Sequence, residues 1–345
     1  MPIQSAQGLP VHTRSLTVSV ARQSETVWHA RGDVIDLRKN GFVPTMYAIQ
    51  PSGIIHNMSI EIAFDPKTLE MKTIAVDQPF VAIEASEVTG GECCRDPAPR
   101  LVELEGDCLD ADFTKRLSAH FGGALGCSHL LTLFQLIAST IPQAVQLEEE
   151  RIHHEKVENR IGDRFFRRSL FLDGFEKDPE TIEVTIQLAD THSRPGSPGD
   201  RPTDPLVKSH EWKTLAAVDR KRFMIRSIDV AERERTAQTL GTADWVSQKH
   251  LVSELSGVPL IPGLAGRLFR LFGDKPSLAP LLANLLQFAP GFIQVTAALM
   301  DQYLVEREAT PKGEETPQPS VANIGGNANS CYMWRDEAPM RLPRP

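Results

Sequence analysis

Apolar and polar residues alternate in two stretches of the chain, a pattern typical of strands that bury one face. In residues 59–64, Ile60, Ile62 and Phe64 alternate with small or polar residues. In the second stretch, Ile182, Val184, Ile186 and Leu188 alternate with Glu183, Thr185 and Gln187. Both stretches are predicted to be half-buried antiparallel strands. A turn at Asp65-Pro66-Lys67-Thr68, echoed by Asp219-Arg220-Lys221-Arg222, is expected to return the chain in a hairpin.

Further along, the apolar spacing changes from two residues to four, which indicates helices. The first such set is Phe113, Leu117 and Phe121, and the second is Leu264, Leu268 and Phe272. Gly122 and Gly273 follow these sets and are placed to end the helices. A longer apolar helix is expected after each. Strands first and helices afterwards predict an α+β fold, in which the helices lie on one face of a small antiparallel sheet.

The two sets of strands and helices are related by an internal repeat. A shift of 154 residues, applied between Arg14 and Val76, pairs identical residues that include Arg14 with Arg168, Asp36 with Asp190, and His56 with His210. A shift of 151 then pairs a second block, 103–143, with identities that include Gln143 and Gln294. Because the period is domain-sized, we expect a tandem duplication of two similar domains.

This organisation predicts four parts of the chain. They are a first α+β unit over residues 1–148, a charged helical linker over 149–163, a second and degenerate unit over 164–304, and a tail over 305–345. The tail is polar and Pro-containing at first, and is therefore expected to be mobile before it docks around Cys331.

Composition and charge exclude several classes of partner. The net charge of -8 comes from 45 acidic and 37 basic residues that are interspersed, so no basic stripe is available for nucleic acid. Five cysteines, an odd and small number, suit a reducing compartment, and no export signal is present at the start, so a cytoplasmic protein is expected. Residues 278–300 carry no charge, but Pro280 and Pro290 favour a buried helix over a membrane span.

The strongest candidate for chemistry is Gly126-Cys127-Ser128-His129, at the expected start of the long helix in the first unit. The second unit has Leu278 and Pro280 where the first has Cys127 and His129. A thiol at a helix N-terminus is expected to have a lowered pKa, which would make Cys127 a nucleophile or a soft-metal ligand. The alternative is that Cys127 is a small buried packing residue.

Other candidates lie earlier in the first unit. Cys93 and Cys94 occupy a Gly-rich turn, and one of them could join a metal site. His56 is a candidate general base. Since His56 and Asp36 both have equivalents in the second unit, a structural role for this pair is also open.

These residues resemble those of a known family. The order His56-Asn57-Met58, then Gly126-Cys127-Ser128-His129-Leu130, then a tail with Asn329-Ser330-Cys331 and Trp334 resembles the bacterial proteins grouped as domain-of-unknown-function family 2889. Members read His-Asp-Met at the first element, so Asn57 departs from the pattern. The resemblance implies that the tail folds back on the first unit and that a sulfur and nitrogen ligand set suited to zinc or an iron–sulfur centre converges, comprising Cys127, His129, Cys331 and Cys93 or Cys94.

The resemblance brings no settled activity, so three functions are carried forward. The first is an enzyme that acts on a small organic molecule, with Cys127 as nucleophile or metal ligand and His129 or His56 as general base. The second is a non-catalytic carrier of zinc or an iron–sulfur cluster. The third is an assembly subunit in which the cysteines only pack. The oligomeric state is left open.

Overall fold

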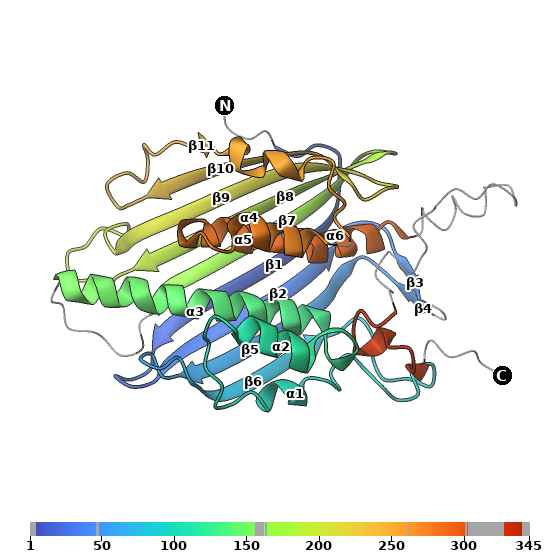
Figure 1. Ribbon diagram of the computed structural model, residues 1–345, viewed down its shortest axis with the longest axis horizontal. Helices are drawn as coiled ribbons and strands as arrows, with labels where there is room; N and C mark the ends of the chain where they lie inside the picture. Colours follow the sequence, from blue (N-terminus) through green and yellow to red (C-terminus); the bar gives the residue numbers. More distant parts are fainter. Residues whose placement is uncertain are drawn as a thin grey trace, which may run out of the picture.

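The computed structural model of the protein describes residues 5–45, 48–155, 162, 164–261, 263–300, 302 and 328–339. Its centre is an antiparallel sheet of nine strands in the order β11-β10-β9-β8-β7-β1-β2-β5-β6 (Figure 1). Those strands are β1 (Leu9–Arg22), β2 (Trp28–Arg38), β5 (Gly53–Phe64), β6 (Met71–Phe80), β7 (Arg164–Asp178), β8 (Thr181–Ser193), β9 (Leu206–Asp219), β10 (Ile225–Arg235) and β11 (Val246–Ser247). A separate hairpin pairs β3 (Val43–Thr45) with β4 (Ala48–Gln50).

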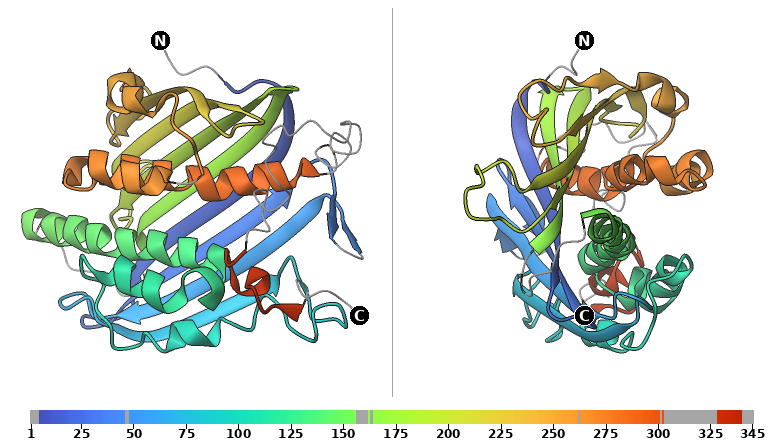
Figure 2. Two further views of the ribbon diagram at one scale, coloured as in Figure 1. Left: turned by 45° about the vertical axis from the view of Figure 1, so that its right-hand side comes forward. Right: turned by 90° about the vertical axis from the view of Figure 1, so that its left-hand side faces the viewer.

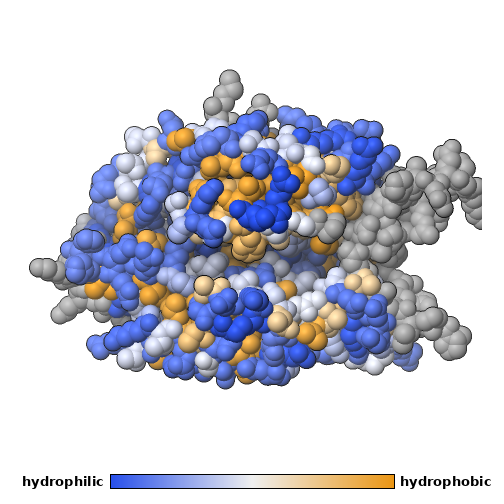
Figure 3. Space-filling view, in the orientation of Figure 1, coloured by the Kyte–Doolittle hydropathy of each residue, from blue (hydrophilic) through white to orange (hydrophobic). Residues whose placement is uncertain are grey.

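The described helices all lie on one face of this sheet (Figure 2). They are α1 (Pro99–Val102), α2 (Phe113–Phe121), α3 (Ser128–Glu155), α4 (Leu264–Phe272), α5 (Ala279–Leu286) and α6 (Phe288–Ala297). Helices α2 and α4 coincide with the two sets of four-residue spacing in the sequence. Apolar side chains gather on the outer surface over the C-terminal helices (Figure 3), where Phe269 of α4 is 49% exposed.

The α+β class is confirmed, but the two predicted small sheets are not separate. The first strand of each half, β1 and β7, pair with each other antiparallel and join all the strands into one sheet. Leu16 faces Leu170 in this register, and these are equivalent positions under the 154-residue shift. The pairing has a physical reason, because it removes two sheet edges whose backbone groups would otherwise be unpaired.

The two halves repeat the same backbone contacts at the predicted hairpins. The amide of Lys67 donates to the Asp65 carboxylate at 2.8 Å, and that of Lys221 donates to Asp219 at 3.0 Å. In both turns the backbone then passes through the left-handed region, at Leu69 (φ 59°) and Phe223 (φ 54°), which are again 154 residues apart. The returning strand is pinned equivalently, by Met71 N to Asp107 O at 2.9 Å and Ile225 N to Val258 O at 3.0 Å.

Two helical stretches are long and apolar enough to cross a membrane by length and composition, Ser128–His154 and Pro276–Ala297. In the most apolar 18-residue window of each, more than half of the residues are buried within the molecule, against the sheet and the other helices, as expected of core helices. The second stretch contains Pro280 in the first turn of α5 and Pro290 in the first turn of α6. At these positions a proline removes no helical hydrogen bond, so both helices tolerate it.

The expected linker and tail are described only in part. Residues 149–155 continue α3, and most of 156–163 lies outside the described residues. The segment 306–318, predicted to be mobile, also lies outside them. Residues 328–339 are described and lie against the turn Gly123–Leu125 that precedes α3.

Toward one end of the buried face of the sheet, the inward-facing residues change from apolar to polar, and these polar residues form the site. In β1 the buried positions Leu16, Val18 and Val20 are apolar, but the same two-residue period continues to Arg14 and His12. In β2 and β5 the period leads in the same way to Asp36 and His56. Cross-strand register places Arg14 opposite Asp36, and Asp36 opposite His56. A polar cluster therefore lies under the helices, within the core rather than on the surface.

Candidate functional site

Asp36 is the centre of this polar cluster. Its carboxylate is fully buried and lies between two imidazoles from the neighbouring strands. His12 Nε2 is 3.1 Å from Oδ1, and His56 Nδ1 is 3.2 Å from Oδ2. Strands β1, β2 and β5 thus each contribute one side chain to a hydrogen-bonded row across the sheet.

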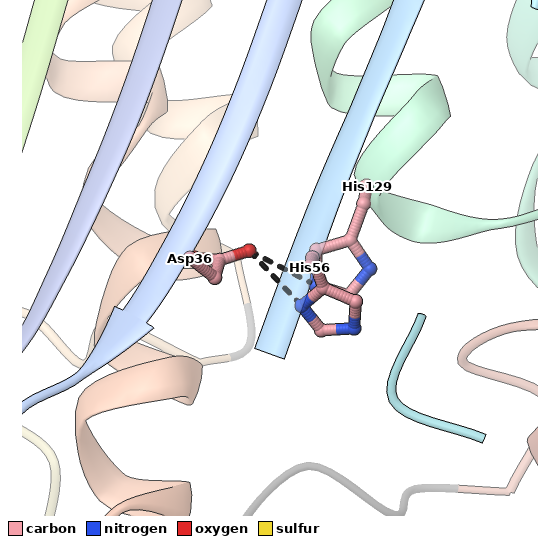
Figure 4. A group of neighbouring side chains, drawn as sticks. All are labelled: Asp36, His56 and His129. Atoms are coloured by element: carbon pink, nitrogen blue, oxygen red, sulfur yellow. Dashed lines mark hydrogen bonds and ion pairs between the residues drawn. The ribbon is translucent and has the colours of Figure 1, made fainter. Parts of the chain in front are cut away.

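His129 joins the cluster from the first turn of α3. Its ring stacks on that of His56 with centroids 3.7 Å apart, and its Nε2 is 3.6 Å from Asp36 Oδ2 (Figure 4). The donor atoms of Asp36, His56 and His129 all lie within 4.8 Å of one another. Helix α6 supplies a further polar contact, because Gln294 Nε2 lies 3.1 Å from His129 Nε2.

Burial and charge fix the protonation of this group. Burial alone would raise the pKa of Asp36, but Arg14 and the hydrogen bonds from His12 and His56 outweigh it and hold that pKa well below 3.8. Burial, and next the neighbouring His56, lower the pKa of His129 well below 6.5. At neutral pH the carboxylate is therefore ionised and the imidazole is neutral, which are the forms that bind metal ions.

Arg14 borders Asp36 without forming a full ion pair. The side chain is 1% exposed, and Nη1 lies 4.0 Å from Asp36 Oδ2. Nε and Nη2 are buried and have no hydrogen-bond partner among the described residues. The oxygens of Asp36 instead face His12 and His56.

The equivalent position in the second half is arranged differently. Arg168 donates two hydrogen bonds of 2.7 Å to the Asp190 carboxylate, one from Nε and one from Nη2. Its Nη2 also donates to Gln143 Oε1 at 2.7 Å. Gln143 comes from α3, just as its equivalent Gln294 comes from α6 to reach His129. The long helix α3 and the shorter helix α6, where the expected second long helix is divided into α5 and α6, therefore each send a glutamine to the other half's cluster.

Cys127 lies beside His129, but it is not an activated thiol. Sγ is 3.8 Å from His129 Nδ1, and the residue is 6% exposed. Burial raises the pKa of Cys127 to about 11, and the backbone N–H groups of Leu130 and His129 offset this only in part. The lowered pKa that the sequence predicts from the helix N-terminus is wrong for this reason, since desolvation of the thiolate outweighs the helix end.

Native Cys127 should consequently resist alkylation. With a pKa of about 11, fewer than about one molecule in a thousand carries the thiolate at pH 7.5. We expect iodoacetamide to label the more accessible Cys93 at least about 100-fold faster than Cys127, by peptide mass spectrometry. Labelling of both at one rate in urea is the control, and equal rates in the native protein would contradict the burial argument.

Two further cysteines approach Cys127 from separate segments. Tyr332 N donates to Gly126 O at 2.8 Å, which brings Cys331 of the tail next to the start of α3. Cys94 packs with Cys331 against Met333 and Ala338. Burial, followed by Cys127 and Cys331, raises the pKa of Cys94 well above 9.0, so these three thiols are protonated neighbours.

The tail is anchored beside these thiols by polar contacts. Arg335 pairs with Glu92, and its guanidinium lies 4.0 Å over the Tyr332 ring.

Cys93 does not join the three neighbouring thiols. Its thiol donates a hydrogen bond to Asp96 Oδ1 at 3.1 Å. Among the described residues, two groups of three or more side chains have donor atoms all within 4.8 Å of one another. Neither contains a cysteine, so the expected sulfur set of Cys93, Cys94, Cys127 and Cys331 does not form a ligand cluster with His129 in this arrangement.

Sequence reasoning named His56 and His129 but gave Asp36 a structural role, and it missed His12, Arg14 and Gln294. The signal was present in the strand period. A charged residue at an inward position of a strand is unusual, and His12 and Arg14 stand in phase with Leu16 and Val18. Only the register between strands, which the sequence does not state, shows that these positions meet.

Comparison with known proteins shows that most of these residues lie inside a region that matches one family model. No curated protein matches the chain. Residues 12–143 match the model of a family described as "Protein of unknown function (DUF2889)". The match begins at His12 and includes Arg14, Asp36, His56 and His129, so the part of the chain that builds the site is similar to the DUF2889 family.

Proposed function

We propose that Asp36, His56 and His129 bind a divalent transition metal, zinc or iron(II), and that the protein is a metal-dependent enzyme acting on a small organic molecule. The convergence of these three donor atoms in a buried site carries the proposal. Two metal–ligand bonds of about 2.0–2.1 Å at a tetrahedral angle hold their donor atoms about 3.3 Å apart. The distances from Asp36 Oδ2 to His56 Nδ1 and His129 Nε2, 3.2 and 3.6 Å, are close to this value.

The number and type of ligands favour an enzyme over a carrier. Two imidazoles and one carboxylate leave coordination positions open, which is typical of catalytic zinc and of non-haem iron sites. A zinc or cluster carrier is expected to close its site with thiolates, but Cys94, Cys127 and Cys331 lie outside the three-donor group. In an open position the metal would polarise a substrate oxygen or lower the pKa of a bound water.

Cys127 receives a positioning role in this proposal. Its thiol faces Nδ1 of His129, on the opposite side of the ring from Asp36. A partner at the second nitrogen fixes the tautomer and orientation of a metal-binding histidine. Cys127 thereby turns Nε2 of His129 toward the carboxylate.

The proposal includes a duplication in which the second half has lost this site. The equivalent contacts at both hairpins and the seam centred on Leu16 and Leu170 support it. Phe166, Leu278 and Pro280 stand at the positions of His12, Cys127 and His129. The retained His210 pairs with Glu232 at 2.6 Å, and Asp190 forms an ion pair with Arg168. The second half then serves as a rigid wall that carries Gln294, whose amide would give up its contact with His129 Nε2 when a metal binds there.

Metal binding by purified protein tests the proposal. After chelation, the protein is titrated with Co²⁺ and followed by visible absorption, with bound metal counted by mass spectrometry. We expect one ion per chain and at least about 100-fold weaker binding in His56→Ala and His129→Ala, because each removes one of three ligands. His210→Ala is the matched control, since this histidine occupies the equivalent strand position.

Two outcomes would overturn the proposal. Loss of the ion in His210→Ala, with retention in His129→Ala, would move the site to the group of His210, Glu232 and Glu234. Loss of Co²⁺ binding in Cys127→Ser and Cys331→Ser, together with normal Co²⁺ binding in His56→Ala and His129→Ala, would favour a carrier that holds its metal through thiolates.

A further inference from the structure

Arg14 presents an unused hydrogen-bonding edge inside the polar cluster. Its Nε and Nη2 hydrogens lie on one side of the guanidinium and form the fork that receives a carboxylate side-on. Both nitrogens are buried and without a hydrogen-bond partner among the described residues. A buried guanidinium with free donors is costly, so this fork is expected to have a ligand in the working protein.

The second half shows what this fork holds when it is filled. In Arg168 the same two nitrogens, Nε and Nη2, donate to the two oxygens of Asp190 at 2.7 Å. Its Nη1 donates to Thr140 at 3.2 Å, so the whole side chain is engaged. Arg14 occupies the equivalent strand position and faces the equivalent aspartate, but His12 and His56 hold that aspartate instead. The fork of Arg14 therefore lacks the carboxylate that its counterpart has.

The net charge of the site also favours an anionic ligand beside Arg14. Asp36 carries one negative charge and Arg14 one positive charge, so the pair is neutral before a metal binds. A divalent ion at Asp36, His56 and His129 would leave two uncompensated positive charges in a buried site. An anionic ligand that touches both the ion and Arg14 would reduce this excess.

We infer that Arg14 binds the carboxylate of the substrate, so that the protein acts on a small organic acid bound between the Arg14 fork and the metal at Asp36, His56 and His129. This inference rests on the proposed function, because it places the carboxylate next to that metal. Arg14 acts as a binding and orienting residue for the substrate. The proposed metal ligands, Asp36, His56 and His129, stay the same in this inference.

Anion titration of the Co²⁺ protein tests the inference. The probes are acetate and inorganic phosphate, added separately at constant ionic strength, and the readout is the visible absorption of the bound ion. We expect acetate to shift the spectrum of the wild-type protein and to bind at least about tenfold more weakly to Arg14→Met, because the fork is lost. Arg14→Lys keeps the charge without the fork and should restore acetate binding only in part. Arg31→Met, on the open face of the sheet, is the control and should leave it unchanged.

The outcomes separate this inference from the metal proposal. Failure of Co²⁺ to bind the wild-type protein would overturn the metal site itself. Co²⁺ binding with no acetate response, or with equal acetate affinity in Arg14→Met, would overturn the role of Arg14 and leave the metal site standing. A response to phosphate alone would replace the carboxylate by a phosphate ester as the substrate group. Retention of Co²⁺ binding by Arg14→Lys and Arg14→Met shows that the variants keep the folded site.

Discussion

Replacing Asp190 with alanine should lower the free energy of unfolding by about 3–5 kcal/mol, because it leaves the buried guanidinium of Arg168 without its counter-ion. Asp190 accepts two charge-assisted hydrogen bonds from Arg168 and a third from Gln143, and both ionic groups are almost wholly buried. Urea unfolding followed by circular dichroism measures the loss. The Co²⁺ affinity of whatever protein remains folded should be unchanged, because the proposed metal ligands lie in the first half.

The control removes both charges together. A double variant, Arg168→Met with Asp190→Leu, places apolar groups of similar size in the same space and should recover most of the lost stability. A loss of less than about 1 kcal/mol in Asp190→Ala would show that the pair is better hydrated than its burial indicates.

Metal-free protein should lose stability steeply as the pH falls below 6.5. Burial lowers the pKa of both His12 and His129 in the folded state, so between the folded and unfolded pKa values the unfolded chain binds more protons. The free energy of unfolding is therefore highest above pH 6.5 and falls below it, with a limiting slope of about 1.4 kcal/mol per pH unit for each such group. Asp36 contributes nothing to this window, since its pKa lies well below 3.8.

Urea unfolding at pH 7.5, 6.0 and 5.0 in the presence of a chelator measures this slope. His12→Phe is the informative variant, because Phe166 stands at the equivalent position of the second half. It should reduce the slope, by up to about 1.4 kcal/mol per pH unit. An unchanged slope in His12→Phe would mean that His12 does not titrate as a buried neutral group.

Much of the fold follows from local patterns in the sequence. The alternation around Ile60 and Ile182 predicts strands, the spacing of Phe113, Leu117 and Phe121 predicts α2, and the order of these elements predicts the α+β class. These predictions succeed because each depends on one face of one element being buried. The joining of β1 to β7 was not predicted, because edge pairing depends on backbone groups that every strand presents equally.

The site was predictable only where its residues adjoin in sequence. Cys127 and His129 were singled out together and His56 separately as a candidate base, but it is strand register that brings Asp36, His12 and Arg14 to them. The pKa of Cys127 was expected to fall because helix ends are visible in a sequence, whereas burial depends on the tail and on β-strand packing. Internal equivalence was also misleading at Asp36, since an aspartate that persists in both halves holds an arginine in one and two histidines in the other.

The seam between β1 and β7 has an evolutionary consequence. Because its register is centred on equivalent residues, it is the contact that two identical chains would make across a two-fold axis. Under the proposed duplication, a single-unit ancestor would have been a homodimer with two identical sites, and any substitution that removed one site would have removed both. Fusion of two copies would lift that constraint. One copy could then replace its site with a rigid ion pair while the other kept an arginine with unpaired donors, so division of labour would become available only to the fused chain.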